Sequence, residues 1–336
     1  MNVVAVLQPG TFTTIQDLGR FGFQRYGVTP SGAMDALALR AANLLVGNDP
    51  GQAGLEITLR GPTLEFERSA LIAICGADLS PSVDDLPLLG WRAIYVQGGS
   101  VLRFGACRWG CRAYLAVGGG IDVPAVMGSR STYVRAGIGG IEGRALGAGD
   151  RLSVGKPAPS AAALTERVVH NLGPMSFAMS ERRAPPRLLE HYDPDRAVRV
   201  LRGPHFELFS APDRDTFLGK DFAVSERSDR MGYRLSGHEL RSAKGTEIVS
   251  TAVLAGTVQV PPGGEPIVLM ADRQTTGGYP IIAQVAEVEL SWLAQRKPGD
   301  TVNFVETTME DAHLAARDQE ELLRSLIEEG EADVSS

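Results

Sequence analysis

Two arginines and an aspartate stand close together in the sequence Ser228–Leu235. Arg230 and Arg234 are four residues apart, on either side of a glycine, and Asp229 directly precedes the first of them. On a strand or an irregular segment, two guanidinium groups at this spacing offer forked donors to a carboxylate or a phosphate, while the aspartate holds one of them. The alternative is a salt-bridge pair on the surface.

A second polar segment follows the most apolar run in the second half of the chain. Asp272–Gly278 contains seven residues without an aliphatic side chain, directly after the run Pro266–Met270. Polar side chains at the end of a buried strand cost free energy unless they point into a cleft. We therefore predict a binding site at this segment, with an elaborate turn as the alternative.

The N-terminal region carries a third set of polar residues between glycines. Gln16, Asp17 and Arg20 come first, and Ser31 and Gly32 follow, ahead of an apolar helical pattern. Glycines let backbone N–H groups approach a ligand, and the N-terminus of a helix favours an anion. The competing interpretation is turn chemistry with an N-cap.

Two further segments have weaker signals. Asn43, Gly47 and Asn48 are typical of the turn that ends a helix. Arg130 and Thr132, which follow a run of glycines, are candidate ligand groups.

Several common catalytic motifs are missing from the chain. It has no phosphate-binding Gly-x-x-x-x-Gly-Lys-Ser/Thr loop, and Gly137–Gly143 misses the spacing of a dinucleotide fingerprint. Zinc-finger spacing, a Gly-x-Ser-x-Gly nucleophile and a biotin-attachment sequence are also absent. Any biotin would have to arrive on another protein.

Composition excludes other classes of function. The net charge is −7, and no basic run exceeds Arg182-Arg183, so we expect no nucleic-acid partner. The first residues resemble neither a signal peptide nor a membrane span. Three cysteines are too few to stabilise a chain of 336 residues by disulfide bonds, which favours a cytoplasmic location.

The elements that must position these residues are mainly strands. The chain holds 39 glycines and 20 prolines that separate short apolar runs, the rhythm of strands and tight turns. Helical periodicity is confined to three segments, 34–46, 213–218 and 309–329. A Pro- and Ala-rich stretch at 155–164 indicates a linker, so we expect domains at 1–156 and 165–308 and a C-terminal helix and tail at 309–336.

Taken together, these segments resemble the biotin-dependent carboxyltransferase-like family, also called the allophanate hydrolase subunit 2 family, which includes the C subunits of 5-oxoprolinases. The resemblance runs from about residue 3 to 306 and is carried by Gln16–Arg20, Ser31–Asp35, Ala42–Asn48, Gly119–Pro124, Gly128–Tyr133, Asp229–Leu235 and Asp272–Pro280. It implies two tandem cyclophilin-like β-barrel domains with a few short helices and a C-terminal helix.

The resemblance also implies an activity and partners. Members act with an A-type, lactam-opening subunit and a cyclophilin-like B-type subunit to open 5-oxo-L-proline to L-glutamate with ATP and Mg²⁺, at a site that the partner subunit could share. In the family the lactam is activated by phosphorylation, which requires cations around the phosphates and residues that bind the substrate carboxylate. We expect no covalently bound biotin. Two other roles stay open: the carboxyltransferase of a urea carboxylase-like system, and a non-enzymatic regulator that binds a B-type partner.

Roles for individual residues follow from this chemistry, and no metal site of the chain's own is predicted. The predicted catalytic residues are Arg230, Arg273 and Asp272; the predicted substrate-binding residues are Arg234, Gln16, Arg20, Ser31, Gln274, Thr275, Thr276 and Tyr279; the predicted cofactor-binding residues are Gly32, Asp229, Gly277 and Gly278.

Overall fold

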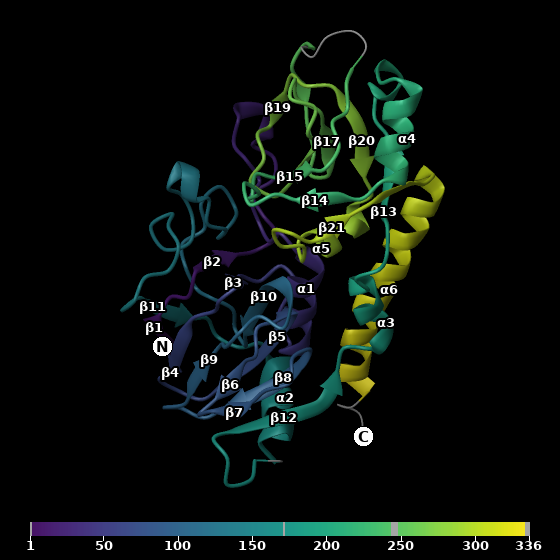
Figure 1. Cartoon of the computed structure of the whole chain (residues 1–336). Coiled ribbons are helices and arrows are strands. Elements are labelled where there is room, and N and C mark those ends of the chain that lie inside the picture. Colours follow the sequence, from purple (N-terminus) through teal and green to yellow (C-terminus); the bar gives the residue numbers. More distant parts are fainter. Residues whose placement is uncertain (1, 171, 243–247, 333–336) are drawn as a thin grey trace. The chain divides into compact units, whose positions relative to one another are not determined.

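The computed structural model describes residues 2–170, 172–242 and 248–332 (Figure 1). Its chain divides into two compact units: Met1–Arg20, Asp35–His191 and Glu320–Ser336 form the first, and Phe21–Met34 and Tyr192–Gln319 form the second. Residues 333–336 of the expected tail lie outside the described part.

The first unit contains two six-stranded sheets. One sheet has the order β11-β1-β4-β9-β6-β7, formed by β1 (Asn2–Gln8), β4 (Thr63–Phe66), β6 (Ser82–Val83), β7 (Leu86–Pro87), β9 (Val101–Arg103) and β11 (Arg151–Val154). The other has the order β12-β8-β5-β10-β3-β2, formed by β2 (Phe12–Gln16), β3 (Gly54–Thr58), β5 (Ala70–Asp78), β8 (Arg92–Val96), β10 (Trp109–Val117) and β12 (Phe177–Arg183). Aliphatic side chains from both sheets form one core.

The second unit is built around an eight-stranded sheet of order β21-β14-β15-β18-β17-β20-β13-β22. Its strands are β13 (Val198–Arg202), β14 (Phe222–Val224), β15 (Gly232–Ser236), β17 (Thr257–Gln259), β18 (Ile267–Leu269), β20 (Ile281–Val285), β21 (Thr301–Val302) and β22 (Phe304–Glu306). A separate pair joins β16 (Thr251–Ala252) to β19 (Thr276–Gly277). The core of this unit is rich in aromatic residues, among them Phe217 stacked on Phe304.

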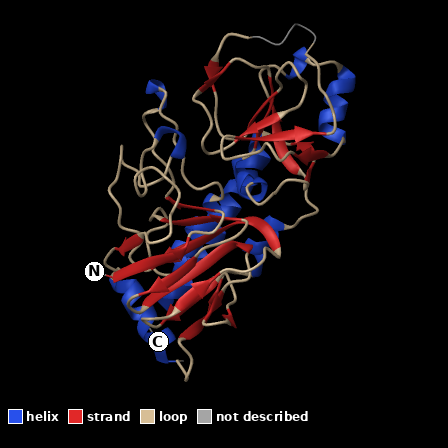
Figure 2. Cartoon of the chain, turned by 60° about the vertical axis from the view of Figure 1, so that its left-hand side comes forward, coloured by secondary structure: helices blue, strands red, loops and turns tan. Residues whose placement is uncertain are grey.

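Helices are few and mostly short, and strands with their loops predominate (Figure 2). The α-helices are α1 (Ala36–Leu45), α2 (Pro159–His170), α3 (Pro186–Leu189), α4 (Ala211–Gly219), α5 (Leu290–Leu293) and α6 (Met309–Ala332); the 3₁₀ turns are η1 (Gln24–Tyr26), η2 (Val134–Ala136), η3 (Glu190–Tyr192), η4 (Phe206–Leu208) and η5 (Glu287–Glu289). The expectation of a mainly β chain with short helices and a C-terminal helix is confirmed. Among the described residues, none of the helices combines the length and the apolar character that crossing a bilayer requires.

Two sequence expectations about element boundaries differ from the structure. The stretch at 155–164, expected as a linker, runs into α2, and the first unit continues to His191 because β12 pairs antiparallel with β8. The start of α1, which the sequence placed near Ser31, lies at Ala36, where the Asp35 carboxylate accepts a hydrogen bond from the Ala38 N–H at 2.9 Å. This side-chain cap is typical of an N-terminus, and Ser31 is left in the preceding loop.

Candidate functional site

Segments 31–32, 230 and 272 meet in the second unit around one buried ion pair. Asp272 accepts a hydrogen bond from Arg230 Nε at 2.9 Å and another from Arg230 Nη2 at 3.1 Å, so the pair is bidentate. Ser31 Oγ donates to the same carboxylate at 2.6 Å. Both charged side chains are more than nine-tenths buried. The Arg230 charge is therefore compensated within the protein.

The loop that carries Ser31 has an uncommon backbone conformation. Ser31 has a φ of 56°, in the left-handed region that non-glycine residues rarely adopt, and Gly32 follows with a φ of 91°. Besides the bond from Ser31 to Asp272, Arg230 Nη2 donates to Gly32 O at 2.6 Å and Thr29 Oγ1 donates to Arg273 O at 2.8 Å, which holds this loop to the rest of the second unit. Strained backbone of this kind persists where the surroundings fix it, often at functional sites.

Arg273 is the next residue after Asp272 but has different surroundings. Its side chain is only 7% exposed, Nη1 donates to Met270 O at 3.3 Å, and Nε has no hydrogen-bond acceptor among the described residues. No carboxylate of the described residues forms a salt bridge with it, and burial alone lowers the pKa of its guanidinium. A buried guanidinium stays charged, so this is a positive charge without a counter-ion in the part of the chain that the structure describes.

Gln259, at the end of β17, lies beside the same segment. It is 2% exposed, and its Oε1 accepts a hydrogen bond from Gln274 Nε2 at 3.3 Å, whereas its Nε2 has no acceptor within the described ranges. The sequence prediction gave Gln259 no role of its own; the available signal was a polar residue at the end of the buried run Thr257–Gln259.

The remaining predicted residues of the second unit lie around this cluster with ordinary structural contacts. Asp229 is exposed and accepts hydrogen bonds from Met231 N and Gly232 N, as an Asx turn does. Arg234 is an exposed residue of β15. The backbone of the last predicted segment pairs with residues 248–253. Thr276 and Gly277 form β19, and the flanking carbonyls of Thr275 and Gly278 accept hydrogen bonds from the N–H groups of Val253 and Ile248. Tyr279 is exposed.

Gln16 and Arg20 belong to the first unit, in a network centred on the Asp17 carboxylate. Asp17 Oδ1 accepts from Ser129 Oγ at 2.7 Å and from Ser131 Oγ at 2.6 Å. Arg20 Nη2 donates to Ser131 O, and Gln16 Nε2 donates to the next backbone carbonyl along the chain at 3.1 Å. These side chains hold the backbone of residues 129–132.

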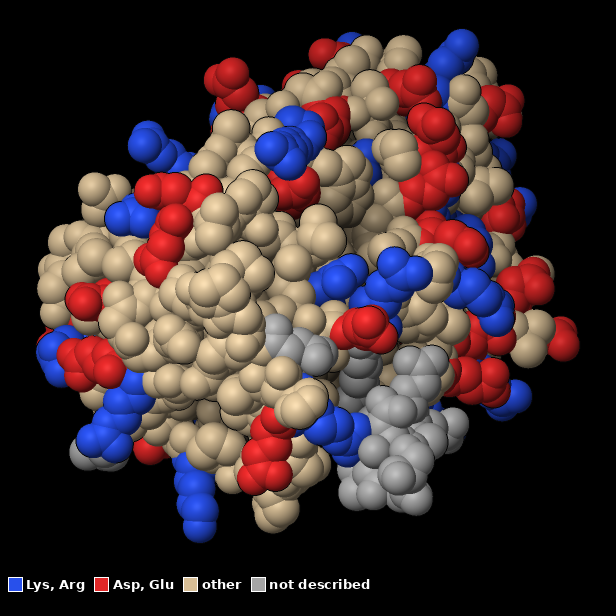
Figure 3. Space-filling model, turned by 90° about the horizontal axis from the view of Figure 1, so that it is seen from below, with Lys and Arg blue, Asp and Glu red and all other residues tan. Residues whose placement is uncertain are grey.

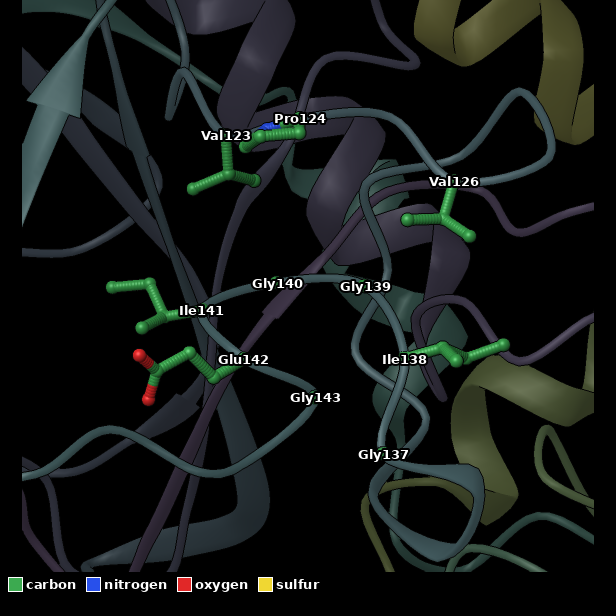
Figure 4. Close-up of a pocket in the computed structure, with 10 residues that line it drawn as sticks. All are labelled: Val123, Pro124, Val126, Gly137, Ile138, Gly139, Gly140, Ile141, Glu142 and Gly143. Atoms are coloured by element: carbon green, nitrogen blue, oxygen red, sulfur yellow. The ribbon is translucent and has the colours of Figure 1, made fainter.

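A groove of about 510 Å³ lies next to that backbone in the first unit. Figure 4 shows Val123 and Val126 on one side of the groove and the loop Gly137–Gly143 on the other. Gly139 packs on Ser131 O so closely that a Cβ could not fit. The Asp17 network therefore supports the loop that forms one wall. The sequence showed only that Gly137–Gly143 is no dinucleotide fingerprint, and the structure gives this loop a role in shaping a groove.

A buried polar cluster that sequence reasoning missed lies at the start of α1. Tyr114 donates to Glu56 Oε2 at 2.7 Å and accepts from Asp35 N at 2.8 Å. Burial, with the nearby Glu56 and Asp35 charges, raises the pKa of Tyr114 well above its usual value. Glu56, flanked by two aliphatic residues in β3, was the available signal.

Asn43 and Asn48 have the structural role that the sequence favoured. Asn48 Nδ2 donates to Asn43 Oδ1 at 3.0 Å, and Asn48 Oδ1 accepts from Gly119 N at 2.8 Å.

On the face shown in Figure 3, described Lys and Arg side chains lie interspersed with Asp and Glu side chains. Within the described ranges, we find no group of three or more His, Cys, Asp or Glu side chains placed to hold a metal ion.

Comparison with known proteins shows the family to which this chain belongs. Residues 26–306 match the carboxyltransferase domain, subdomains A and B, and the chain belongs to that family. It is 41% identical to the 5-oxoprolinase C subunit of Escherichia coli strain K12 over 96% of this chain and 97% of that one. It is 36% identical to the 5-oxoprolinase C subunit of Haemophilus influenzae over 97% of this chain and 99% of that one.

Larger proteins contain a similar region. The chain is 35% identical to urea amidolyase of Lachancea kluyveri, over 96% of its own length and 18% of that protein. The crystal structure of Kluyveromyces lactis urea carboxylase superposes with a TM-score of 0.85 at 32% identity, over 96% of this chain and 29% of that one.

Proposed function

We propose that this chain is the C subunit of a 5-oxoprolinase, a complex that opens 5-oxo-L-proline to L-glutamate with ATP. The support is the 41% identity to a protein of that name over nearly the full length of both chains. The expectation drawn from the sequence motifs agrees with this similarity.

The observation that carries the proposal on the structural side is the Arg273 guanidinium. It is buried, it has no carboxylate partner among the described residues, and Thr29 holds its backbone in place. A lactam carbonyl is a poor electrophile, and its opening depends on fixed charges that bind the substrate and stabilise the negative charge that develops. We assign this work to Arg273. Arg230 and Asp272 act as positioning residues, because their charges neutralise each other.

The buried ion pair offers Mg²⁺-bound ATP no free carboxylate. Both carboxylate oxygens of Asp272 accept hydrogen bonds from Arg230 or Ser31. Asp229 is exposed and uses its Oδ1 in a turn. Mg²⁺ binds phosphates together with one or two free carboxylates. In our proposal ATP is used by the complex, and partner chains supply its site.

The proposal includes two partner chains, an A-type subunit that opens the lactam and a B-type subunit, and predicts that the isolated chain is inactive. The related proteins are named as C subunits, a name that belongs to a component of a multi-chain enzyme. We also propose a cytoplasmic location, because three cysteines are too few to hold a chain of 336 residues together by disulfides.

The test is ATP-dependent release of glutamate from 5-oxo-L-proline by this chain purified with its A-type and B-type partners, with each chain omitted in turn. Activity that requires all three chains supports the proposal. A well-formed complex that releases no glutamate contradicts it. Activity of the two partner chains that is unchanged without this chain contradicts it too.

A carboxyltransferase step in a urea carboxylase-like system is the second candidate, favoured by the similarity to urea amidolyase and to the urea carboxylase structure. Such a step would require biotin on a partner, because this chain has no biotin-attachment sequence. Carboxylation of urea by this chain with a carboxylated biotin domain distinguishes it from the first proposal. A regulator that only binds a B-type chain would leave both assays without activity.

A further inference from the structure

Gln259, at the end of β17, and Arg273, in the segment that follows β18, each carry a donor without an acceptor. Arg273 Nε and Gln259 Nε2 are both buried, and neither has a hydrogen-bond partner among the described residues. An unpaired donor in the interior costs about 1–3 kcal/mol, and Gln259 contacts Gln274, the residue after Arg273. A ligand bound at this segment would supply the missing acceptors.

The surrounding contacts fix the Gln259 carboxamide. Gln274, the residue after Arg273, donates to Gln259 Oε1 at 3.3 Å, which leaves Nε2 as the free end. Gly277 lies directly against Nε2, and a Cβ at that position would come closer than van der Waals contact permits. The glycine therefore keeps the amide in place, and two residues of the segment after Arg273, Gln274 and Gly277, define its surroundings.

The charge of the cluster limits what it can bind. Arg230 is compensated by the bidentate contact with Asp272, so within the described residues Arg273 contributes the one uncompensated charge of this ion-pair cluster. One positive charge with a neutral N–H donor matches a monoanion with two acceptor oxygens. A triphosphate carries several negative charges and calls for additional cations.

We propose that Arg273 and Gln259 bind the carboxylate of the substrate, and that the ATP phosphates bind outside this cluster. This inference rests on the proposed function for the identity of the substrate, a cyclic amide that bears a carboxylate. It adds Gln259 as a specificity-determining residue and excludes Arg273 from phosphate binding.

Binding to the full-length chain tests the inference without any turnover. We would measure the midpoint of thermal unfolding with 5-oxo-L-proline, with sodium acetate, with inorganic phosphate and with Mg²⁺-ATP, at matched ionic strength. The two carboxylates should raise the midpoint of the native chain and leave that of Arg273→Met unchanged. The inference would be overturned if phosphate or Mg²⁺-ATP raised the midpoint of the native chain but not that of Arg273→Met. It would also be overturned if neither carboxylate raised the midpoint of the native chain.

Gln259→Glu is the sharper variant because it preserves the shape of the side chain and the acceptor for Gln274. It replaces the free N–H with an anion that repels a carboxylate, so the shift caused by 5-oxo-L-proline should disappear while the unliganded protein stays folded. Arg227→Met is the matched control: Arg227 is an exposed arginine of the same unit, paired with Glu265 at 2.9 Å, and the variant should bind like the native chain. Retained binding in Gln259→Glu would remove Gln259 from the site.

Kinetics of the reconstituted complex separate failure of this inference from failure of the proposed function. Arg273→Met and Gln259→Glu should raise the KM for 5-oxo-L-proline roughly tenfold or more and change the KM for ATP by less than about twofold. If the two variants raised only the KM for ATP, the oxoprolinase proposal would still hold, but the assignment of a carboxylate-binding site to these residues would be wrong. If the native complex releases no glutamate, the binding experiment still decides the question.

Discussion

Asp272 accepts hydrogen bonds from Arg230 through both of its carboxylate oxygens, in an ion pair that is more than nine-tenths buried. The pair joins the end of β18 to the start of β15 and holds the Ser31 loop through the same carboxylate. The pair gives Asp272 and Arg230 a structural role, and Arg273, the next residue, is the arginine that we propose binds a ligand.

Removing one partner of this pair should destabilise the second unit. Arg230→Met leaves a buried carboxylate with a single donor, Ser31, and the expected loss is about 3–5 kcal/mol. Urea denaturation followed by tryptophan fluorescence measures it, since Trp292 lies in the core of that unit. The double variant Arg230→Met, Asp272→Leu should lose less than Arg230→Met alone. A single-variant loss below about 1 kcal/mol would contradict the structural role.

Ser31 offers a comparison between strain and hydrogen bonding. Ser31→Ala removes the 2.6 Å bond to Asp272 and keeps a Cβ at a φ of 56°, whereas Ser31→Gly removes the bond and relieves the strain. We expect the glycine variant to be more stable than the alanine variant by about 1 kcal/mol. Thermal unfolding of the two variants side by side checks the order. The reverse order would show that the left-handed backbone carries little strain.

The loop of the groove in the first unit should depend on one glycine. Gly139→Ala places a Cβ against Ser131 O and next to Arg20, so the backbone must move, and we expect a loss of more than about 3 kcal/mol. Gly128→Ala is the control, since Gly128 has a similarly positive φ of 78° with nothing within 4 Å of the added Cβ. Its loss should be about 1 kcal/mol. Equal losses would mean that backbone strain, and not packing on the Asp17 network, decides the effect.

Tyr114 should make the first unit sensitive to alkaline pH. Its pKa is raised in the folded protein, chiefly by burial, so the unfolded chain releases the phenolic proton first. The stability that depends on this proton is complete below the ordinary tyrosine pKa of about 10 and declines as the pH rises above that value. Tyr114→Phe should be less stable at neutral pH, because the bond to Glu56 is lost, yet decline less between pH 9 and about 11. Parallel stability curves for the two proteins would contradict this account.

Much of the fold could be predicted because its signals are local. Glycines and prolines between short apolar runs predicted strands, and the helical periodicity predicted α1, α4 and α6. The pairing of β12 with β8 could not be predicted, since it joins residues about 85 apart and leaves no local trace. For the same reason the Ala-rich stretch at 155–164 resembled a linker, although it leads into α2 of the first unit.

The candidate site was predictable as a set of segments but not as a set of contacts. Ser31, Arg230 and Asp272 do come together, yet the composition could not tell which arginine is neutralised: Arg230 and Arg273 have the same chemistry, and only the structure pairs one with Asp272. Gln16 and Arg20 were predicted as substrate ligands, and in the structure their side chains donate hydrogen bonds to backbone carbonyls of the first unit. Their role toward a substrate stays a prediction.

The most direct test of the central claim is kcat/KM for glutamate release from 5-oxo-L-proline by the three-chain complex that contains Arg273→Met, compared with the same complex that contains Arg227→Met. Loss of a charged contact to the substrate predicts a fall of about 30-fold or more for Arg273→Met, with complex assembly intact. The Arg227→Met complex should retain the native rate. A native rate with Arg273→Met would contradict the claim that this guanidinium acts on the substrate.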